Sequence, residues 1–214
     1  MTTGLAESAH THAIADVTNL QTSLDGKAAS SHAHSAADIT SGSLSMSLIS
    51  SGAITTDKLA QVLTFATAKA SGSGTTIDFT VIPAWAKRIT VMLQGVSTSG
   101  TSNLILQLGT GATPTYTNSG YVGSVSTTAG GATNFSTGFM LNSSLAATDV
   151  MHGVVSLLNI SGNNWCESSI LSHSSTATTR NGAGAVSLGA ALTAVRLTTV
   201  NGTDTFDAAS GLVN

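Results

Sequence analysis

The sequence predicts a mainly β protein, in which a short repetitive trimeric shaft of brief helices and extended rungs precedes an antiparallel β-sandwich or jelly-roll domain. Only 8% of the 214 residues are charged and 4% are aromatic. The abundant small hydroxyl and amide side chains suit strands and turns. A motif repeats within residues 1–61, and alternation of period two begins near residue 62. We therefore predict a shaft and trimerisation region at 1–61 and a β-sandwich domain at 62–214.

The shaft region contains the dyad His-x-His twice. His10 and His12 form the first copy, and His32 and His34 recur 22 positions later with the same following Asp and Thr. A unit this short cannot bury a core of its own. The repeat therefore predicts a stalk in which three parallel copies of the chain share one seam.

Two interpretations of the dyads remain open. On an extended strand, residues i and i+2 face the same side, so both imidazoles of a dyad can point at one site. Three chains around a threefold axis would complete an octahedral cage, which suits Fe²⁺ or a similar divalent transition ion better than tetrahedral zinc. The candidate ligands are His10, His12, His32 and His34. Alternatively, these histidines only cap and hydrogen-bond the start of each repeat, and no cofactor is bound.

Short apolar elements follow each dyad. Spacings of three and four residues predict a narrow helical seam, which Asp25–Gly26 ends. The seam consists of Ile14, Val17, Leu20 (or Gln21) and Leu24. In the second unit the segments 39–44 and 49–54 echo one another and predict short apolar rungs with a glycine turn.

Apolar segments in the second region predict strands. The clearest are 77–81, 89–93, 104–108, 151–160 and 194–200. Glycine-rich turn signals separate them, and about ten strands are expected at the spacing of an antiparallel sandwich. Asn201–Gly202 is the strongest hairpin signal, and Pro83 is expected to end one strand and turn the chain.

Composition excludes several functions. The net charge is −3 and the seven cations are scattered, so no basic stripe is present for nucleic acid. No apolar run approaches the ~20 residues of a membrane span, so membrane insertion is not expected. Residues 1–4 show no signal-peptide pattern, which favours release by cell lysis or assembly into a particle. The single Cys166 cannot form an intrachain disulfide.

Four residues are candidates for binding a ligand. Tyr116 and Tyr121 flank a turn, and Trp165 follows Gly162-Asn163-Asn164. Their rings could stack on a pyranose, or else plug the edge of the sandwich or a seam between chains. Arg180 lies in the polar stretch 174–181, where it either holds an acidic or sulfated group or is solvated.

The sequence assigns no catalytic residue. His152 and His173 lie among many serines, but no Gly-x-Ser-x-Gly elbow follows a strand. We expect no enzyme. A carboxylate pair drawn from Asp149, Asp204 and Asp207 keeps glycosidic cleavage as an alternative.

The quoted motifs resemble those of tailed-bacteriophage tail fibres. Residues 10–28, 31–40 and 51–59 resemble fibre repeats, and residues 77–91, with Ile-Pro-Ala-Trp-Ala-Lys-Arg-Ile-Thr, are similar to the start of a distal β-domain of phage and prophage fibres. The resemblance implies a homotrimer whose thin shaft leads to a domain that contacts bacteria. In some long fibres His-x-His motifs bind iron on the threefold axis.

The expected function is therefore a trimeric receptor-binding adhesin of the virion tail fibre. Its partners would be copies of itself, upstream fibre or baseplate proteins, and a lipopolysaccharide glycan or outer-membrane protein of the host. It would be made in the host cytoplasm and act outside the cell. The alternatives are a structural fibre or baseplate element without receptor contact, and a polysaccharide depolymerase.

Overall fold

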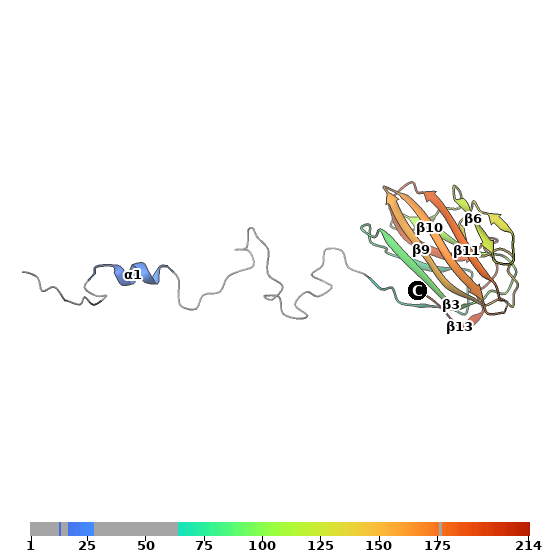
Figure 1. The fold of residues 1–214 in the computed structure, drawn as a ribbon, viewed down its shortest axis with the longest axis horizontal. Helices are drawn as coiled ribbons and strands as arrows, with labels where there is room; N and C mark the ends of the chain where they lie inside the picture. The colour runs from blue at the N-terminus through green and yellow to red at the C-terminus, as the bar shows by residue number, and fades with distance from the viewer. Residues whose placement is uncertain (1–12, 14–16, 28–63, 176) are drawn as a thin grey trace, which may run out of the picture. The chain divides into compact units, whose positions relative to one another are not determined.

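The computed structural model describes residue 13 and residues 17–27, 64–175 and 177–214 (Figure 1). The chain divides into two units, Met1–Thr55 and Thr56–Asn214. The predicted boundary between residues 61 and 62 lies outside the described residues and stays a prediction. No helix in the described part of the chain is long and apolar enough to span a membrane.

The first unit contains the helix α1 (Leu20–Asp25). Its end confirms the predicted stop, because the Gly26 N–H donates to the Thr22 carbonyl at 3.1 Å. The seam residues Val17, Leu20 and Leu24 are 49%, 37% and 54% exposed. Within this chain α1 therefore has no buried residue to stabilise it, and a helix this short needs packing to persist in water.

The second unit confirms the prediction of a mainly β fold with antiparallel sheets. Its strands are β1 (Lys69–Ser71), β2 (Ile77–Thr80), β3 (Arg88–Val96), β4 (Leu104–Thr110), β5 (Thr115–Tyr116), β6 (Val122–Thr127), β7 (Ala132–Asn134), β8 (Phe139–Met140), β9 (Met151–Ser161), β10 (Asn164–His173), β11 (Thr179–Ser187), β12 (Leu192–Thr199) and β13 (Ala208–Val213). All five segments with the clearest strand pattern form strands, and Pro83 lies in the turn after β2, where its carbonyl accepts from the Ala86 N–H at 2.9 Å.

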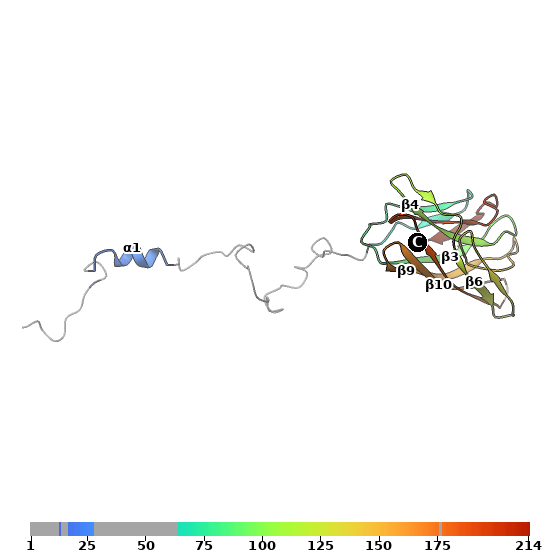
Figure 2. The same ribbon diagram turned by 90° about the horizontal axis from the view of Figure 1, so that it is seen from above.

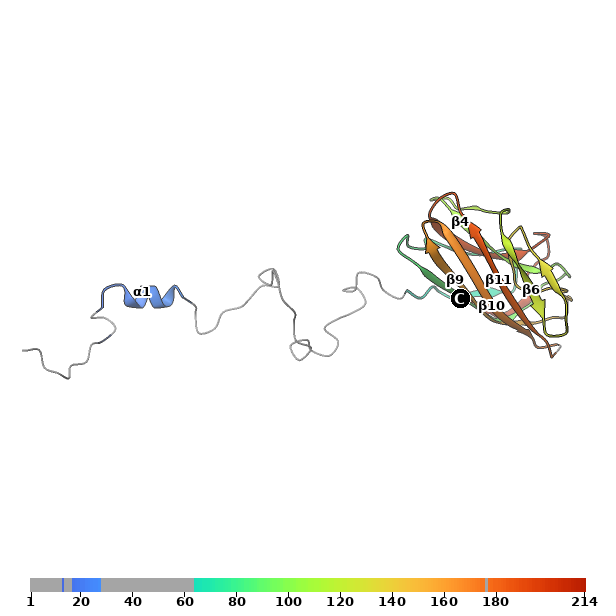
Figure 3. The same ribbon diagram turned by 45° about the horizontal axis from the view of Figure 1, so that its top comes forward.

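The strands form two sheets. Sheet A has the order β1-β13-β3-β9-β10-β11-β6-β7, and sheet B has the order β2-β12-β4-β5, with β8 added beside β4. The sheets lie as two layers (Figure 2), and β9, β10 and β11 run side by side through sheet A (Figure 3). This is the arrangement of a β-sandwich.

The core lies between the sheets because alternate residues of each strand point inward. Leu104, Leu106 and Leu108 of β4 are fully buried. Leu157 and Leu171 on β9 and β10 are buried with them in one cluster. Each such side chain contributes about 1.5–3 kcal/mol relative to exposure, so the two inner faces supply most of the stabilisation.

The hairpin predicted at Asn201–Gly202 is wrong. A turn does form there, with the Gly202 N–H donating to the Thr199 carbonyl at 3.0 Å. However, β12 belongs to sheet B and β13 to sheet A. The Asn201 carboxamide explains the difference, because its oxygen accepts from the Thr203 and Asp204 N–H groups and its Nδ2 donates to Asp204. These bonds fix a corner that crosses between the sheets.

A buried carboxyl group lies on the inner face of β10. Glu167 is 3% exposed, and burial raises its pKa from 4.5 to about 7. A group whose pKa is raised by folding contributes stability that is complete at acid pH and is lost as the pH rises through the folded value. Ionised Glu167 therefore destabilises the sandwich above neutrality.

We predict that Glu167→Gln raises the free energy of unfolding at about pH 8 by on the order of 3 kcal/mol, and changes it little near pH 4. Urea unfolding followed by tryptophan fluorescence at both pH values measures the difference. The exposed Asp25→Asn in α1 is the control for loss of a carboxylate. Equal effects of Glu167→Gln at the two pH values would contradict the prediction.

Candidate functional site

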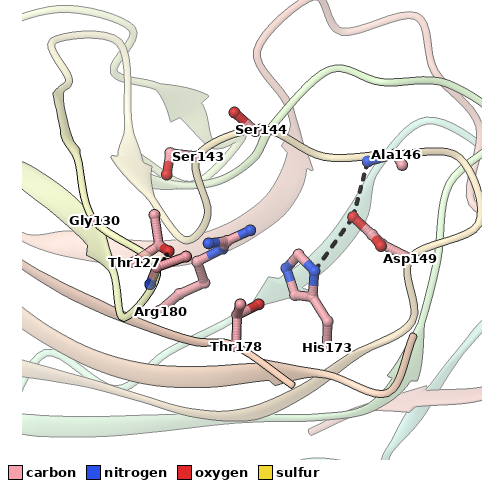
Figure 4. A pocket seen from close by; sticks show the side chains of 10 residues that line it. Thr127, Gly130, Ser143, Ser144, Ala146, Asp149, His173, Thr178 and Arg180 are labelled. Carbon is pink, nitrogen blue, oxygen red and sulfur yellow. Dashed lines mark hydrogen bonds and ion pairs between the residues drawn. The ribbon is translucent and has the colours of Figure 1, made fainter. Parts of the chain in front are cut away.

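A pocket of about 410 Å³ opens where three loops meet (Figure 4). Thr127 at the end of β6 and Gly130 in the turn that follows line one side. The segment between β8 and β9 provides Ser143, Ser144, Ala146 and Asp149. The connection from β10 to β11 provides His173, Thr178 and Arg180 at its two ends. Residues far apart in sequence meet here because β6 and β10 end, and β11 begins, at this corner of sheet A.

Hydrogen bonds hold Asp149 in the wall of the pocket. Its Oδ2 accepts from the Ala146 N–H at 2.8 Å, and its Oδ1 accepts from the Ser175 hydroxyl at 2.6 Å. His173 Nδ1 lies 3.3 Å from Oδ2. These contacts attach the segment before β9 to the end of β10 and so fix the shape of the wall.

The pKa values of this pair follow from burial and from neighbouring groups. Burial alone would raise the Asp149 pKa, but Ala146, Ser175, His173 and Arg180 outweigh it and lower the pKa. For His173, burial and Arg180 outweigh the attraction of Asp149, so its pKa lies below 6.5. At neutral pH the imidazole is therefore neutral, and Asp149 and Arg180 are the charged groups of the pocket.

Arg180 is a buried cation. It is the second residue of β11, on the inner face, and is 7% exposed. Its Nε has no hydrogen-bond partner, and no ion pair to it forms among the described residues. The Oγ1 of Thr178, two residues earlier, is also buried without a partner in the described part of the chain. Figure 4 shows the guanidinium between Thr127 and His173.

Two of the aromatic candidates are core residues. Tyr121 is 2% exposed, and its hydroxyl oxygen accepts from the Leu108 N–H at 2.8 Å. Its ring packs edge-on against Phe139 with centroids 4.9 Å apart, and burial raises its pKa to about 12. Trp165 is 4% exposed on the inner face of β10. Both rings point into the sandwich, so the structure favours the interpretation that they fill its interior, and a receptor-binding role for them stays a prediction.

The third aromatic candidate lies elsewhere. Tyr116 is half-buried on β5 of sheet B, and the Arg196 guanidinium covers its ring at 3.8 Å from the centroid. Arg196 is itself neutralised by Asp78 through two hydrogen bonds of 2.7 and 2.8 Å. Tyr116 and Arg180 therefore belong to different sheets and do not form one site. A receptor-binding role for either residue stays a prediction.

Two further sequence predictions concern histidines. The four dyad histidines lie outside the described residues, so their metal site is still a prediction. Within residues 13, 17–27, 64–175 and 177–214 no group of three or more His, Cys, Asp or Glu is placed to hold a metal. His152 instead accepts a hydrogen bond at Nδ1 from the Gly95 N–H at 3.1 Å.

Sequence reasoning did not connect Asp149 with His173. His173 ends β10 and pairs with Met151 of β9, so the register of the β9–β10 hairpin brings it beside the segment that carries Asp149. The signal that could have found the pocket was Arg180, a lone cation in a polar stretch. That stretch ends earlier than expected, because β11 begins at Thr179.

One comparison with known families gives a match. The model described as "Phage tail repeat like" matches residues 5–55, the segment that contains both His-x-His dyads. The match supports a phage tail protein. It also suggests a component of the virion tail. The matched segment lies outside the β-domain, so the match does not describe that domain. Comparison with curated proteins and with solved structures found no match.

We predict that Asp149→Asn lowers the free energy of unfolding at neutral pH by about 1–3 kcal/mol, because buried donors lose a charged acceptor. The Asp149 pKa is lowered by folding, so this stability is present above the unfolded pKa and is lost as the pH falls through the folded value. Denaturant unfolding at neutral pH and near pH 3 measures the change. An equal loss at both values would contradict the assignment, and Asp25→Asn is again the control.

Proposed function

We propose that this phage tail protein is a receptor-binding fibre, in which three chains share a shaft and their β-domains attach the virion to the bacterial surface. Upstream fibre or baseplate proteins would hold the other end. The observation that carries the proposal is a tail-repeat segment followed by a β-domain with an open pocket. Loops positioned by a rigid sandwich are a common place for binding sites.

Binding without cleavage is favoured by the chemistry of the pocket. Glycoside hydrolysis generally needs two carboxyl groups on opposite sides of the scissile bond. Among the described residues lining this pocket Asp149 is the only acid, and both of its oxygens accept hydrogen bonds from the protein. We therefore favour attachment over a depolymerase.

The outer face of sheet A supports association of several copies. Solvent-facing positions of an antiparallel sheet are usually polar. Here Met92, Val154 and Ile170 lie in one cross-strand row and are 43%, 43% and 63% exposed. A second row contains Leu158, 39% exposed, and Val122, 65% exposed.

The same face has little to oppose contact between copies. A row of hydroxyl-bearing and small residues, from Thr90 through Ser156, Ser168 and Ala183 to Ser124, separates the two apolar rows. Across these three rows the charged side chain is Arg88, at the end of one row. Identical neutral faces do not repel one another, and burying them would be favourable. We propose second and third copies of this chain as the occupants.

Val154→Lys combined with Ile170→Lys should shift the full-length chain from trimer toward monomer, because paired copies would bury like charges. Sedimentation equilibrium measures the mass. Val200→Lys, at a 46% exposed apolar position outside sheet A, is the matched control. A monomeric wild type would contradict the trimer, and a double variant as trimeric as the wild type would exclude this face.

Attachment and its alternatives separate in one assay. The full-length chain is applied to an array of bacterial surface glycans and to outer-membrane vesicles, with released reducing ends measured in parallel. We expect binding without release, strengthened by avidity when three tips act together. Release would show a depolymerase, and neither binding nor release would favour a structural role.

A further inference from the structure

The Arg180 guanidinium needs a counter-charge that the described protein does not place beside it. Arginine stays protonated at all physiological pH values. A buried cation is costly unless it is paired and hydrogen-bonded. Arg180 is 93% removed from solvent, since 7% of it is exposed, and its Nε has no partner among the described residues. An oxyanion entering the pocket would supply the guanidinium with a counter-charge.

Asp149 does not fill this role. Its carboxylate is engaged by the Ala146 N–H, the Ser175 hydroxyl and His173. Figure 4 shows it directed toward Ala146 and His173, with the Arg180 side chain on the opposite side of the imidazole. The charge of Arg180 helps to lower the Asp149 pKa, but Arg180 forms no ion pair with Asp149 in the described structure. The charge of Asp149 is therefore already engaged by Ala146, Ser175 and His173, and the guanidinium faces the cavity.

A second unsatisfied polar atom belongs to another residue that lines the same pocket. Thr178 Oγ1 is buried and has no partner among the described residues. The hydroxyl groups of Thr127 and Ser143 line the wall nearby. A cation next to hydroxyl groups suits a ligand that presents an oxyanion together with neutral hydroxyls. The volume of about 410 Å³ lies at the lower end of small-molecule pockets, roughly 300–1,000 Å³, which fits a single sugar unit.

We propose that this pocket binds one acidic sugar unit of the bacterial surface, with Arg180 holding its carboxylate or phosphate oxygens and Thr178 a neighbouring oxygen. Arginine offers a planar fork of donors that matches both groups. The inference rests on the proposed attachment function and names the chemistry that its pocket would select. Carboxylate and phosphate differ in charge and shape, so separate ligands distinguish them.

The test is binding of glucuronic acid, glucose 6-phosphate and glucose to the full-length chain, by isothermal titration and ligand-observed NMR. We expect one or both acids to bind and glucose to bind at least about tenfold more weakly, as for hydrogen bonds to a charged group. Arg180→Gln should remove the preference for acid. Arg88→Gln deletes a cation at an exposed position of β3 and should leave binding unchanged.

A stability measurement and a second variant keep the test decisive. Arg180→Gln removes a buried charge that has no ion pair among the described residues, so the variant should melt no earlier than the wild type. Thr178→Val should weaken acid binding several-fold without changing the fold. Equal binding of glucose and the acids, an unchanged preference in Arg180→Gln, or no binding of any acid would overturn the inference. If the chain still binds surface glycans in that case, attachment stands and only this pocket assignment fails.

Discussion

The packing of sheet A against sheet B is the contact on which the rest of the β-domain depends. Buried leucines of β4 and β12 form one cluster with Leu157 of β9 and Leu171 of β10. Alternate side chains of β9 and β10 pack in this contact, which fixes where the two strands end. The pocket is a consequence, because its three loops leave the sandwich at one corner. Changes to the core would move the loops even if every pocket residue stayed the same.

Charged residues are scarce in this protein, and the buried ones lie close together. Glu167, His173 and Arg180 all lie on the inner faces of β10 and β11, and Asp149 faces them from the preceding loop. Their responses to pH oppose one another. Acidification removes the cost of ionised Glu167, whose pKa is raised, but weakens the contacts of Asp149, whose pKa is lowered. The sandwich interior and the pocket wall are therefore most stable under different conditions.

The two outer faces of the sandwich differ in chemistry. Sheet B places the Asp78–Arg196 ion pair and the Tyr116 ring together, so its polar groups satisfy one another. Sheet A instead exposes apolar rows, in which Ile170 and Val122 are 63% and 65% exposed. A chain with few charges has limited means to keep such a face soluble. Association of copies through sheet A would leave the pocket loops, which lie at the end of the strands, to meet a receptor.

The sequence by itself determined the β-domain and several of its turns. Period-two alternation at Ile77, Ile89 and Leu104 marks strands because side chains alternate across a sheet, and Asp25–Gly26 marks a helix end for a local backbone reason. Tertiary structure decided which sheet each strand joins, so the Asn201–Gly202 turn crosses between sheets. It also decided that Tyr121 and Trp165 point inward and that Asp149, His173 and Arg180 meet. These outcomes depend on contacts between distant residues, whereas local patterns report only on backbone preference and on which residues share a face.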